Sequence, residues 1–269
     1  MPSHIYKYES VTTRSLQNLK NQVIYFGSPL NFNDPYDCAL APSIRVPNDD
    51  EIERIRSAEL RSKTLPEEGK EIIRRRSATE LRLMYLRIGQ DAVNGAIRDF
   101  LKKNGVSCFS ERNDSLLMWA HYGGHSKGLC LQFDTNFDPF RNLRQVKYTQ
   151  EMPEIDLLPI ICDRNFDQIL DLYCTKALDW AYEQEWRGIH REVGIAYTYK
   201  SQALTSVYFG PEIPFELFEI VCLILAGQNE QVKLWRGMRS KSDFSVDFES
   251  VQYTSHVDAK RQGLLKPDA

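Results

Sequence analysis

Two glutamates separated by one residue are well suited to acid–base chemistry. Glu183 and Glu185 lie on either side of Gln184 in the segment Y-E-Q-E-W-R. In an extended strand alternate side chains share one face, so we expect both carboxylates in one cleft, about 7 Å apart. Such a pair can act as acid and base, or one member can stabilise a cation. The alternative is a solvated helix end at Glu183 and an ion pair between Glu185 and Arg187.

A second group of polar and aromatic side chains lies in residues 106–134, between two apolar runs that predict buried strands. The segment W-A-H-Y-G-G-H places His121 and His125 four residues apart, as in a zinc-binding helix. The intervening glycines interrupt a helix, however, and the required glutamate is missing, so we predict no metal site. Two interpretations stay open: the glycines expose backbone amides to a ligand such as a phosphate, or they cap a helix.

Other side chains near these segments have two interpretations each. Asn33 and Asp34 suit either a turn or a ligand contact. Ser110 can orient a ribose or a carbonyl, but no G-x-S-x-G motif surrounds it and no spacing indicates a Ser-His-Asp triad. Five aromatic residues can stack on a planar ligand or pack in the core. They are Tyr6, Tyr8, Phe32, Trp119 and Tyr122.

The periodicity of apolar residues predicts the elements that position these side chains. The first thirty residues predict a strand, a helix and a strand, and residues 49–103 predict two or three amphipathic helices. Further strands are expected at V-K-Y-T, W-R-G-I-H-R-E, A-L-T-S-V-Y-F-G, E-I-V-C-L-I-L-A-G and F-S-V-D-F-E-S-V. A long helix is expected over residues 164–182, and the apolar stripe of residues 232–238 has helical spacing.

These elements predict an α+β fold with a curved, mainly antiparallel sheet and flanking helices. We expect one domain over residues 1–269, with the helical insertion near residues 49–103 and a polar tail from about residue 256. The apolar fraction of 42% is sufficient for a sizeable core.

Composition excludes several classes of protein. The 34 basic and 37 acidic side chains create no overall field for binding nucleic acid or anionic membranes. No apolar run could span a bilayer and no secretion signal is recognised, so we expect a cytoplasmic protein with no membrane partner. The six cysteines show no C-x-x-C pair and are expected to be reduced core residues.

Several ordered motifs resemble the bacterial domain-of-unknown-function family 2971 (DUF2971). They are Y-K-Y, S-P-L-N-F-N-D-P-Y-D, C-F-S-E, L-M-W-A-H-Y-G, H-S-K-G-L-C-L-Q-F-D and Y-E-Q-E-W-R. The resemblance covers most of residues 4–230 and implies a fold relationship without a known activity.

The order of these motifs is also similar, more weakly, to that of ADP-ribosyltransferases. In that comparison Ser110 stands for the serine at a strand end, Glu185 for the catalytic glutamate and Glu183 for its companion. The first strand departs from the pattern, because Lys7 lies where an arginine or histidine is expected. The similarity implies an enzyme that uses NAD as substrate and stabilises an oxocarbenium-like ribose, in bacterial defence or a toxin system.

The same similarity implies roles for the surrounding side chains. Tyr8 or Tyr122 would stack on nicotinamide, while Lys7, His121 or Arg187 would hold the diphosphate. The remaining members of the expected binding site are Asn33, Ser110, Trp119 and His125. The acceptor would be a protein or a nucleic acid, and the oligomeric state is left open. Two alternatives stay open: a non-catalytic module that binds a nucleotide or an RNA end, and a hydrolase that uses the glutamate pair.

Overall fold

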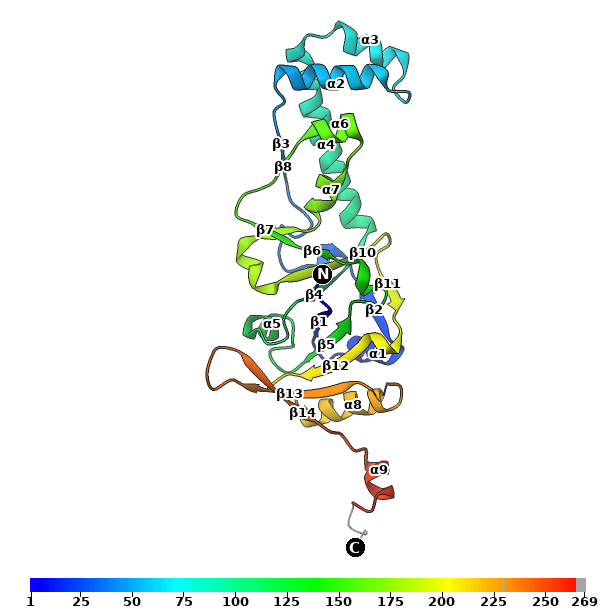
Figure 1. Ribbon diagram of the computed structural model, residues 1–269, viewed down its shortest axis with the longest axis vertical. Helices are drawn as coiled ribbons and strands as arrows, with labels where there is room; N and C mark the ends of the chain where they lie inside the picture. The colour runs from blue at the N-terminus through cyan, green and yellow to red at the C-terminus, as the bar shows by residue number, and fades with distance from the viewer. Residues whose placement is uncertain (230, 265–269) are drawn as a thin grey trace.

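An eight-stranded sheet forms the centre of the molecule (Figure 1). The computed structural model describes residues 1–229 and 231–264. Neighbouring strands are antiparallel, except that β12 and β13 run parallel. In spatial order the strands are β14 (Val246–Val251), β13 (Lys233–Arg239), β12 (Leu204–Phe209), β5 (Leu129–Asp134), β1 (His4–Glu9), β4 (Gly105–Ser110), β10 (Glu185–His190) and β6 (Arg144–Gln145). The predicted α+β class with a mainly antiparallel sheet is confirmed.

Each face of the sheet packs against its own helices because side chains alternate along the strands. On β5, Leu131 and Phe133 belong to the core that includes α8 (Phe215–Ala226) and α1 (Thr13–Asn21). Cys130, which precedes Leu131 and points to the other face, contributes to a smaller core with Trp119 of α5 (Leu116–His121). Both core layers therefore follow from the alternation of residues along the central strands.

Three helices form an arm that extends from the sheet (Figure 1). They are α2 (Asp49–Arg61), α3 (Glu67–Arg75) and α4 (Ala78–Lys103), which confirms the predicted helical insertion. Capping boxes begin two of them, at Asn48 for α2 and at Ser77 for α4. A second core joins this arm to α6 (Leu157–Asp163), α7 (Asp167–Leu172) and the strand pair of β3 (Ser43–Ile44) with β8 (Glu154–Ile155).

The long helix predicted over residues 164–182 is wrong. Helix α7 ends at Leu172, and the chain then forms β9 (Thr175–Ala177) and the 3-10 helix η3 (Leu178–Glu183). Strand β9 pairs in parallel with β7 (Lys147–Thr149). Strand β7 itself was predicted from the sequence, at V-K-Y-T. The pairing carries Lys176 into a cluster of buried carboxylates, so tertiary contacts override the apolar periodicity.

Two predictions near the C-terminus are also wrong. The run E-I-V-C-L-I-L-A-G is part of α8 and not a strand, because a short apolar run does not distinguish a buried strand from a buried helix. The stripe in residues 232–238 belongs to strand β13, which pairs with β12 and β14. Within the predicted polar tail, α9 (His256–Arg261) is a short helix, and residues 265–269 lie outside the described part.

The N-terminal prediction of strand, helix and strand is confirmed by β1, α1 and β2 (Val23–Phe26). The strands expected at β7, β10, β12 and β14 are present as well. Strand β2 pairs with β11 (Ile195–Thr198), and the 3-10 helix η1 (Pro29–Asn31) follows it. In residues 1–229 and 231–264, no helix combines the length and the apolar character needed to cross a membrane.

Candidate functional site

The central sheet opens between β1 and β4. These strands pair at one position, Tyr6 with Ser110, whereas β4 pairs with β10 along its whole length. Beyond that position the amine of Lys7 crosses the opening, where it donates to Ser107 Oγ at 3.1 Å and to the Cys108 carbonyl oxygen at 3.4 Å. The opening is therefore a feature of the strand register, and it leaves room for a cavity inside the sheet.

A cavity of about 440 Å³ occupies this opening, within the size range of small-molecule sites. Its walls are largely aromatic, from Tyr6, Tyr8, Tyr25, Phe32 and Tyr122. Its lining also includes the carboxylates of Asp37, Glu183 and Glu185 and the amine of Lys176, all of which belong to buried residues. The cavity therefore combines stacking surfaces with concentrated charge.

The two glutamates converge by a tight turn and not by strand alternation. Glu183 ends η3, Gln184 adopts the left-handed conformation with φ of 43°, and Glu185 begins β10. Both carboxylates nevertheless contact the amine of Lys176, at 2.5 Å for Glu183 Oε2 and 3.4 Å for Glu185 Oε2. The expected extended geometry is therefore wrong. Of the alternative, the solvated Glu183 is wrong, since its exposure is 3%, whereas the ion pair between Glu185 and Arg187 is present.

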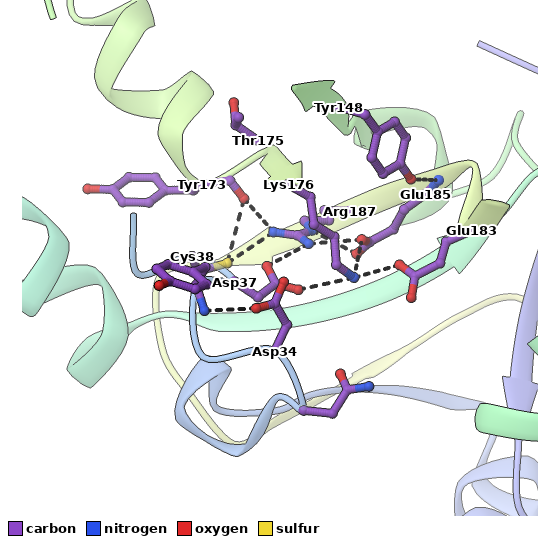
Figure 2. Close-up of polar contacts among 12 residues, drawn as sticks. Asp34, Asp37, Cys38, Tyr148, Tyr173, Thr175, Lys176, Glu183, Glu185 and Arg187 are labelled. Atoms are coloured by element: carbon purple, nitrogen blue, oxygen red, sulfur yellow. Dashed lines mark hydrogen bonds and ion pairs between the residues drawn. The ribbon is translucent and has the colours of Figure 1, made fainter. Parts of the chain in front are cut away.

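Lys176 is surrounded by three carboxylates (Figure 2). In addition to the two glutamates, Asp37 places Oδ2 at 3.3 Å from the amine. Asp37 comes from the loop N-D-P-Y-D, and Lys176 from β9, so the cluster joins distant parts of the chain. Within the described residues, no group of His, Cys, Asp and Glu side chains has an arrangement suited to a metal ion. The ammonium of Lys176 occupies the centre where these carboxylates meet.

Arg187 is fully buried and uses its whole guanidinium inside the cluster (Figure 2). Its Nε and Nη2 donate to the two oxygens of Glu185 at 2.7 and 2.9 Å, and Nη2 lies 2.7 Å from Asp37 Oδ1. Its Nη1 donates to the Tyr173 carbonyl oxygen at 2.8 Å and to Cys38 Sγ at 3.1 Å. Arg187 does not line the cavity, so it has no group left for a diphosphate.

The cluster carries unequal charge, with three carboxylates against two cations and hence one negative charge in excess. Burial opposes ionisation of Glu185, but the charge and hydrogen bonds of Arg187, together with Lys176, lower its pKa to about 2. For Glu183, burial raises the pKa above its ordinary value, and the charge of Glu185 adds to this, in spite of Lys176. Environments that separate the pKa values of two carboxyl groups are typical of acid–base pairs.

A hydrogen-bond chain links Glu183 to the surface. Tyr122 donates its hydroxyl proton to Glu183 Oε1 at 2.6 Å, and Asn33 Nδ2 donates to the Tyr122 oxygen at 3.3 Å. Burial, and then the hydrogen bond to Glu183, raise the pKa of Tyr122, so its phenol stays protonated at neutral pH. Glu183 is thus the carboxylate whose hydrogen bonds reach toward the exposed side of the cavity.

Ser110 holds the turn that carries Glu183. Its Oγ donates to the Glu183 carbonyl oxygen at 2.6 Å and accepts from the Arg112 amide at 3.1 Å. Because the side chain is fully buried and its hydroxyl proton is used, it positions Glu183 from the end of β4. Orienting a ribose is not the contact that this geometry provides.

The segment W-A-H-Y-G-G-H ends a helix and packs closely. Trp119 is fully buried, and its indole nitrogen donates to the Asn113 carbonyl oxygen at 2.7 Å. A Cβ at Gly123 would lie 2.5 Å from Trp119 Cε3, and Gly124 has a φ of +57°. These contacts account for both glycines, which favours the helix-cap interpretation over exposed amides for a phosphate.

The structure brings most of the predicted site together. The predicted residues that line the cavity are Lys7, Tyr8, Asn33, Ser110, His121, Tyr122, Glu183 and Glu185. Those that do not are Trp119, His125 and Arg187, of which His125 is exposed. Sequence analysis missed Asp37 and Lys176. Asp37 lay in a motif that was recognised, whereas Lys176 was hidden in the segment wrongly predicted as a long helix.

Comparison with known proteins gives one result. Residues 118–188 match the model of a family described as "Protein of unknown function (DUF2971)". The sequence resemblance to DUF2971 is confirmed over that segment. The segment contains Tyr122, Lys176, Glu183, Glu185 and Arg187, so it includes most of the charged cluster. No curated protein and no solved structure matches the chain.

Proposed function

We propose that the protein is an enzyme that binds the nicotinamide riboside end of NAD in this cavity and transfers or hydrolyses ADP-ribose. One observation carries the proposal: a buried charge cluster with an excess negative charge lies at the base of an aromatic cavity. The nicotinamide ring of NAD is planar and cationic, so it suits both the aromatic walls and the negative interior.

The chemistry follows from where positive charge develops. As the bond between ribose C1′ and nicotinamide breaks, its electron pair leaves with neutral nicotinamide, and the ribose becomes oxocarbenium-like. A fixed negative environment stabilises that state more than the ground state. The acceptor oxygen or nitrogen then bonds to C1′ and releases a proton. We assign uptake of that proton to Glu183, whose raised pKa suits a base, while Glu185 contributes fixed charge.

Other cavity residues support binding. Tyr122 and Tyr8 offer ring faces for stacking. Because Arg187 does not line the cavity, we assign binding of the diphosphate to Lys7 and His121, which do. Asn33 bonds Tyr122 at the exposed end of the hydrogen-bond chain. The proposal therefore keeps the sequence-predicted NAD site but shifts proton transfer to Glu183.

The direct test measures release of labelled nicotinamide from NAD, and transfer of label from adenine-labelled NAD to protein or nucleic-acid acceptors. Glu183→Gln should lower turnover by about 100-fold or more, because it removes the base without removing the hydrogen-bonding shape. The matched control is Glu249→Gln, an exposed glutamate on β14, which should keep the wild-type rate.

A second variant separates chemistry from folding. Tyr122→Phe keeps the ring in the wall but removes the donor to Glu183, so turnover should fall. The thermal unfolding midpoint should fall modestly, because Glu183 keeps the amine of Lys176 as a partner. The proposal is wrong if the wild-type protein neither binds NAD nor releases nicotinamide with any acceptor class. It is also wrong if Glu183→Gln, correctly folded, turns over NAD at the wild-type rate.

A non-catalytic nucleotide-binding module is the second candidate, and one observation favours it. Both oxygens of Glu185 are already bound by Arg187, as expected of a structural ion pair. This alternative predicts that NAD or an RNA end raises the unfolding temperature without any product. It also predicts that the shift persists in Glu183→Gln, whereas an enzyme would show product in the wild-type protein.

A further inference from the structure

A second cavity lies in the helical arm, apart from the charged cluster. It measures about 300 Å³ and lies between α4 on one side and α6 and α7 on the other. Its lining is almost wholly apolar, with Val93 from α4, Leu157 and Ile161 from α6, and Ile169 from α7. Figure 1 shows these helices side by side, between the end of the arm and the sheet. We call this space the arm groove.

Small residues on α4 create the arm groove. Gly89, Ala92 and Ala96 follow at intervals of three and four, so they share one helix face. Leu157 fills the space over Gly89, where a Cβ would lie 2.8 Å from Leu157 Cδ2. Ala92 and Ala96 also line the groove, and their short side chains leave room beside α6 and α7. The groove follows from the choice of side chains on a regular helix.

The rim of the arm groove exposes large apolar side chains. Ile88 is 54% exposed and Phe166 is 53% exposed, and both line the groove. Leaving two such side chains in water at the mouth of an apolar cavity costs free energy that an apolar occupant would recover.

One charged residue lines this apolar space. The Tyr85 hydroxyl has no hydrogen-bond partner among the described residues, but it has almost no accessible surface, so an occupant of the groove would not reach it. Glu59 is the one charged residue in the lining, and none of its carboxylate contacts in the described chain is an ion pair. Burial, and then the charge of Glu59, raise the pKa of Tyr85 to about 12. Arg56 lies nearby, but it already bonds Glu53 and the Ile73 carbonyl oxygen.

We propose that the arm groove binds an amphiphilic amine, a molecule with an apolar body of a few carbon atoms' width and a single ammonium head. The body would lie against α4, α6 and α7 and cover Ile88 and Phe166. The ammonium would donate to the Glu59 carboxylate. A carboxylate with an apolar chain of the same length would be repelled by Glu59. We therefore expect the groove to prefer a positively charged head group over a negatively charged one.

The test titrates n-octylamine into the full-length protein labelled at isoleucine methyl groups, and follows the methyl NMR signals. Ile88, Ile160, Ile161 and Ile169 line the groove and should shift with saturation, whereas Ile5 in the sheet core should not. Octanol should bind about tenfold more weakly, and octanoate more weakly still, because each loses the charge-assisted contact with Glu59.

Three variants locate the site. Ala92→Leu fills the arm groove and should abolish saturable shifts, while Asp91→Leu places the same side chain at the exposed neighbouring position and should leave them intact. Glu59→Gln should remove the preference for octylamine over octanol. Its matched control is Glu68→Gln, an exposed glutamate on α3 outside the groove, which should keep the preference.

Several outcomes would overturn the proposal. One is the absence of saturable shifts at the groove methyl groups, and another is equal affinity for octylamine and octanoate. A third is a concentration-dependent dimer in sedimentation experiments that Ala92→Leu abolishes and octylamine does not affect, because a second copy of the chain would then be the occupant.

Discussion

Arg187 determines how the buried carboxylates can exist at neutral pH. Its guanidinium binds both oxygens of Glu185 and contacts Asp37, while Lys176 contacts the same two carboxylates from the other side. Glu183 is left to share Lys176 with them. The unequal distribution of cations separates two glutamates that are almost adjacent in sequence into one firmly ionised group and one that binds a proton more readily.

The difference between the pKa values of Glu183 and Glu185 predicts that the stability of the fold depends on pH. A pKa lowered from 4.5 to about 2 means that Glu185 stabilises the fold above pH 4.5, and that roughly 3 kcal/mol is lost as the pH falls to 2. Glu183 has the opposite sign, because its pKa is raised and its contribution is lost as the pH rises. Urea unfolding of wild type and Glu185→Gln measures the contribution of Glu185 together with its effect on the pKa of Glu183.

The difference in unfolding free energy between wild type and Glu185→Gln should be largest near pH 6 and should shrink steadily below pH 4.5. Glu249→Gln provides the comparison, because an exposed carboxylate on β14 should give a small difference that does not vary with pH. A difference for Glu185→Gln that stays constant down to pH 2.5 would contradict the assignment of a firmly ionised Glu185.

At the scale of elements, the turn between η3 and β10 aims the two glutamates. Gln184 has a φ of 43°, a region that non-glycine residues rarely adopt, and its side chain is exposed. The turn is held by Ser110, which bonds the Glu183 carbonyl oxygen, and by the Tyr148 hydroxyl, which accepts from the Glu185 amide at 2.8 Å. Neighbouring strands therefore fix a conformation that the local sequence does not favour.

Substitution at Gln184 should reveal this local cost. Gln184→Gly should leave the unfolding free energy unchanged or raise it by up to about 1 kcal/mol, because glycine adopts positive φ freely. Gln184→Val should lower it by about 1–2 kcal/mol, because a β-branched residue is strained there. Chemical denaturation measures both. Equal stability of the two variants would show that the turn relaxes to negative φ.

The sequence predicted elements well where one face alone decided their burial. The capped helices α2 and α4 of the arm are such cases, because periodicity and capping residues specify them locally. It failed where the decisive contact was distant. Thr175 and Lys176 fit a helical pattern, yet pairing with β7 and the carboxylates around the Lys176 amine determine a strand.

The candidate site was predicted in part for the same reason. The E-x-E pair and Tyr122 belong to compact motifs whose residue types indicate chemistry, and the structure places them on one cavity. Asp37 and Lys176 carry no such local signal, since their importance comes from meeting across 139 positions of the chain. Trp119 shows the opposite error, because a tryptophan among polar residues suggested a ligand contact but fills the core.

At the scale of the molecule, the charged cluster lies where two hydrophobic cores meet. Cys38 and Tyr173, both contacts of Arg187, belong to the core of the arm, whereas Trp186, the neighbour of Arg187 on β10, belongs to the core of the sheet. The cavity, the cluster and the junction of the cores thus coincide. Ion pairs among buried groups are costly to leave incomplete, so the cluster ties the orientation of the arm to the sheet.

This arrangement predicts unequal protection in native-state hydrogen exchange. Helix α3 has no side-chain cap and one buried residue, Ile73, so its amides should exchange through local opening at low free energy. Amides of β1 and β5 that bond each other, and amides of β4 that bond β10, should exchange only near global unfolding, because these pairings are complete. Mass-spectrometric exchange at increasing denaturant measures both groups.

Removing the contacts of Arg187 should accelerate hydrogen exchange in the arm more than in the sheet. Arg187→Met leaves Asp37 and Glu185 buried without their arginine, which should lower the unfolding free energy by about 3–5 kcal/mol. The loss should appear first as faster exchange in β9, α7 and α4, because Tyr173 and Cys38 lose their contact with β10. Arg191→Met, at an exposed position beyond β10, is the control and should change neither. Uniform acceleration across arm and sheet in Arg187→Met would mean that the two cores unfold as one unit and that the cluster does not join separable parts.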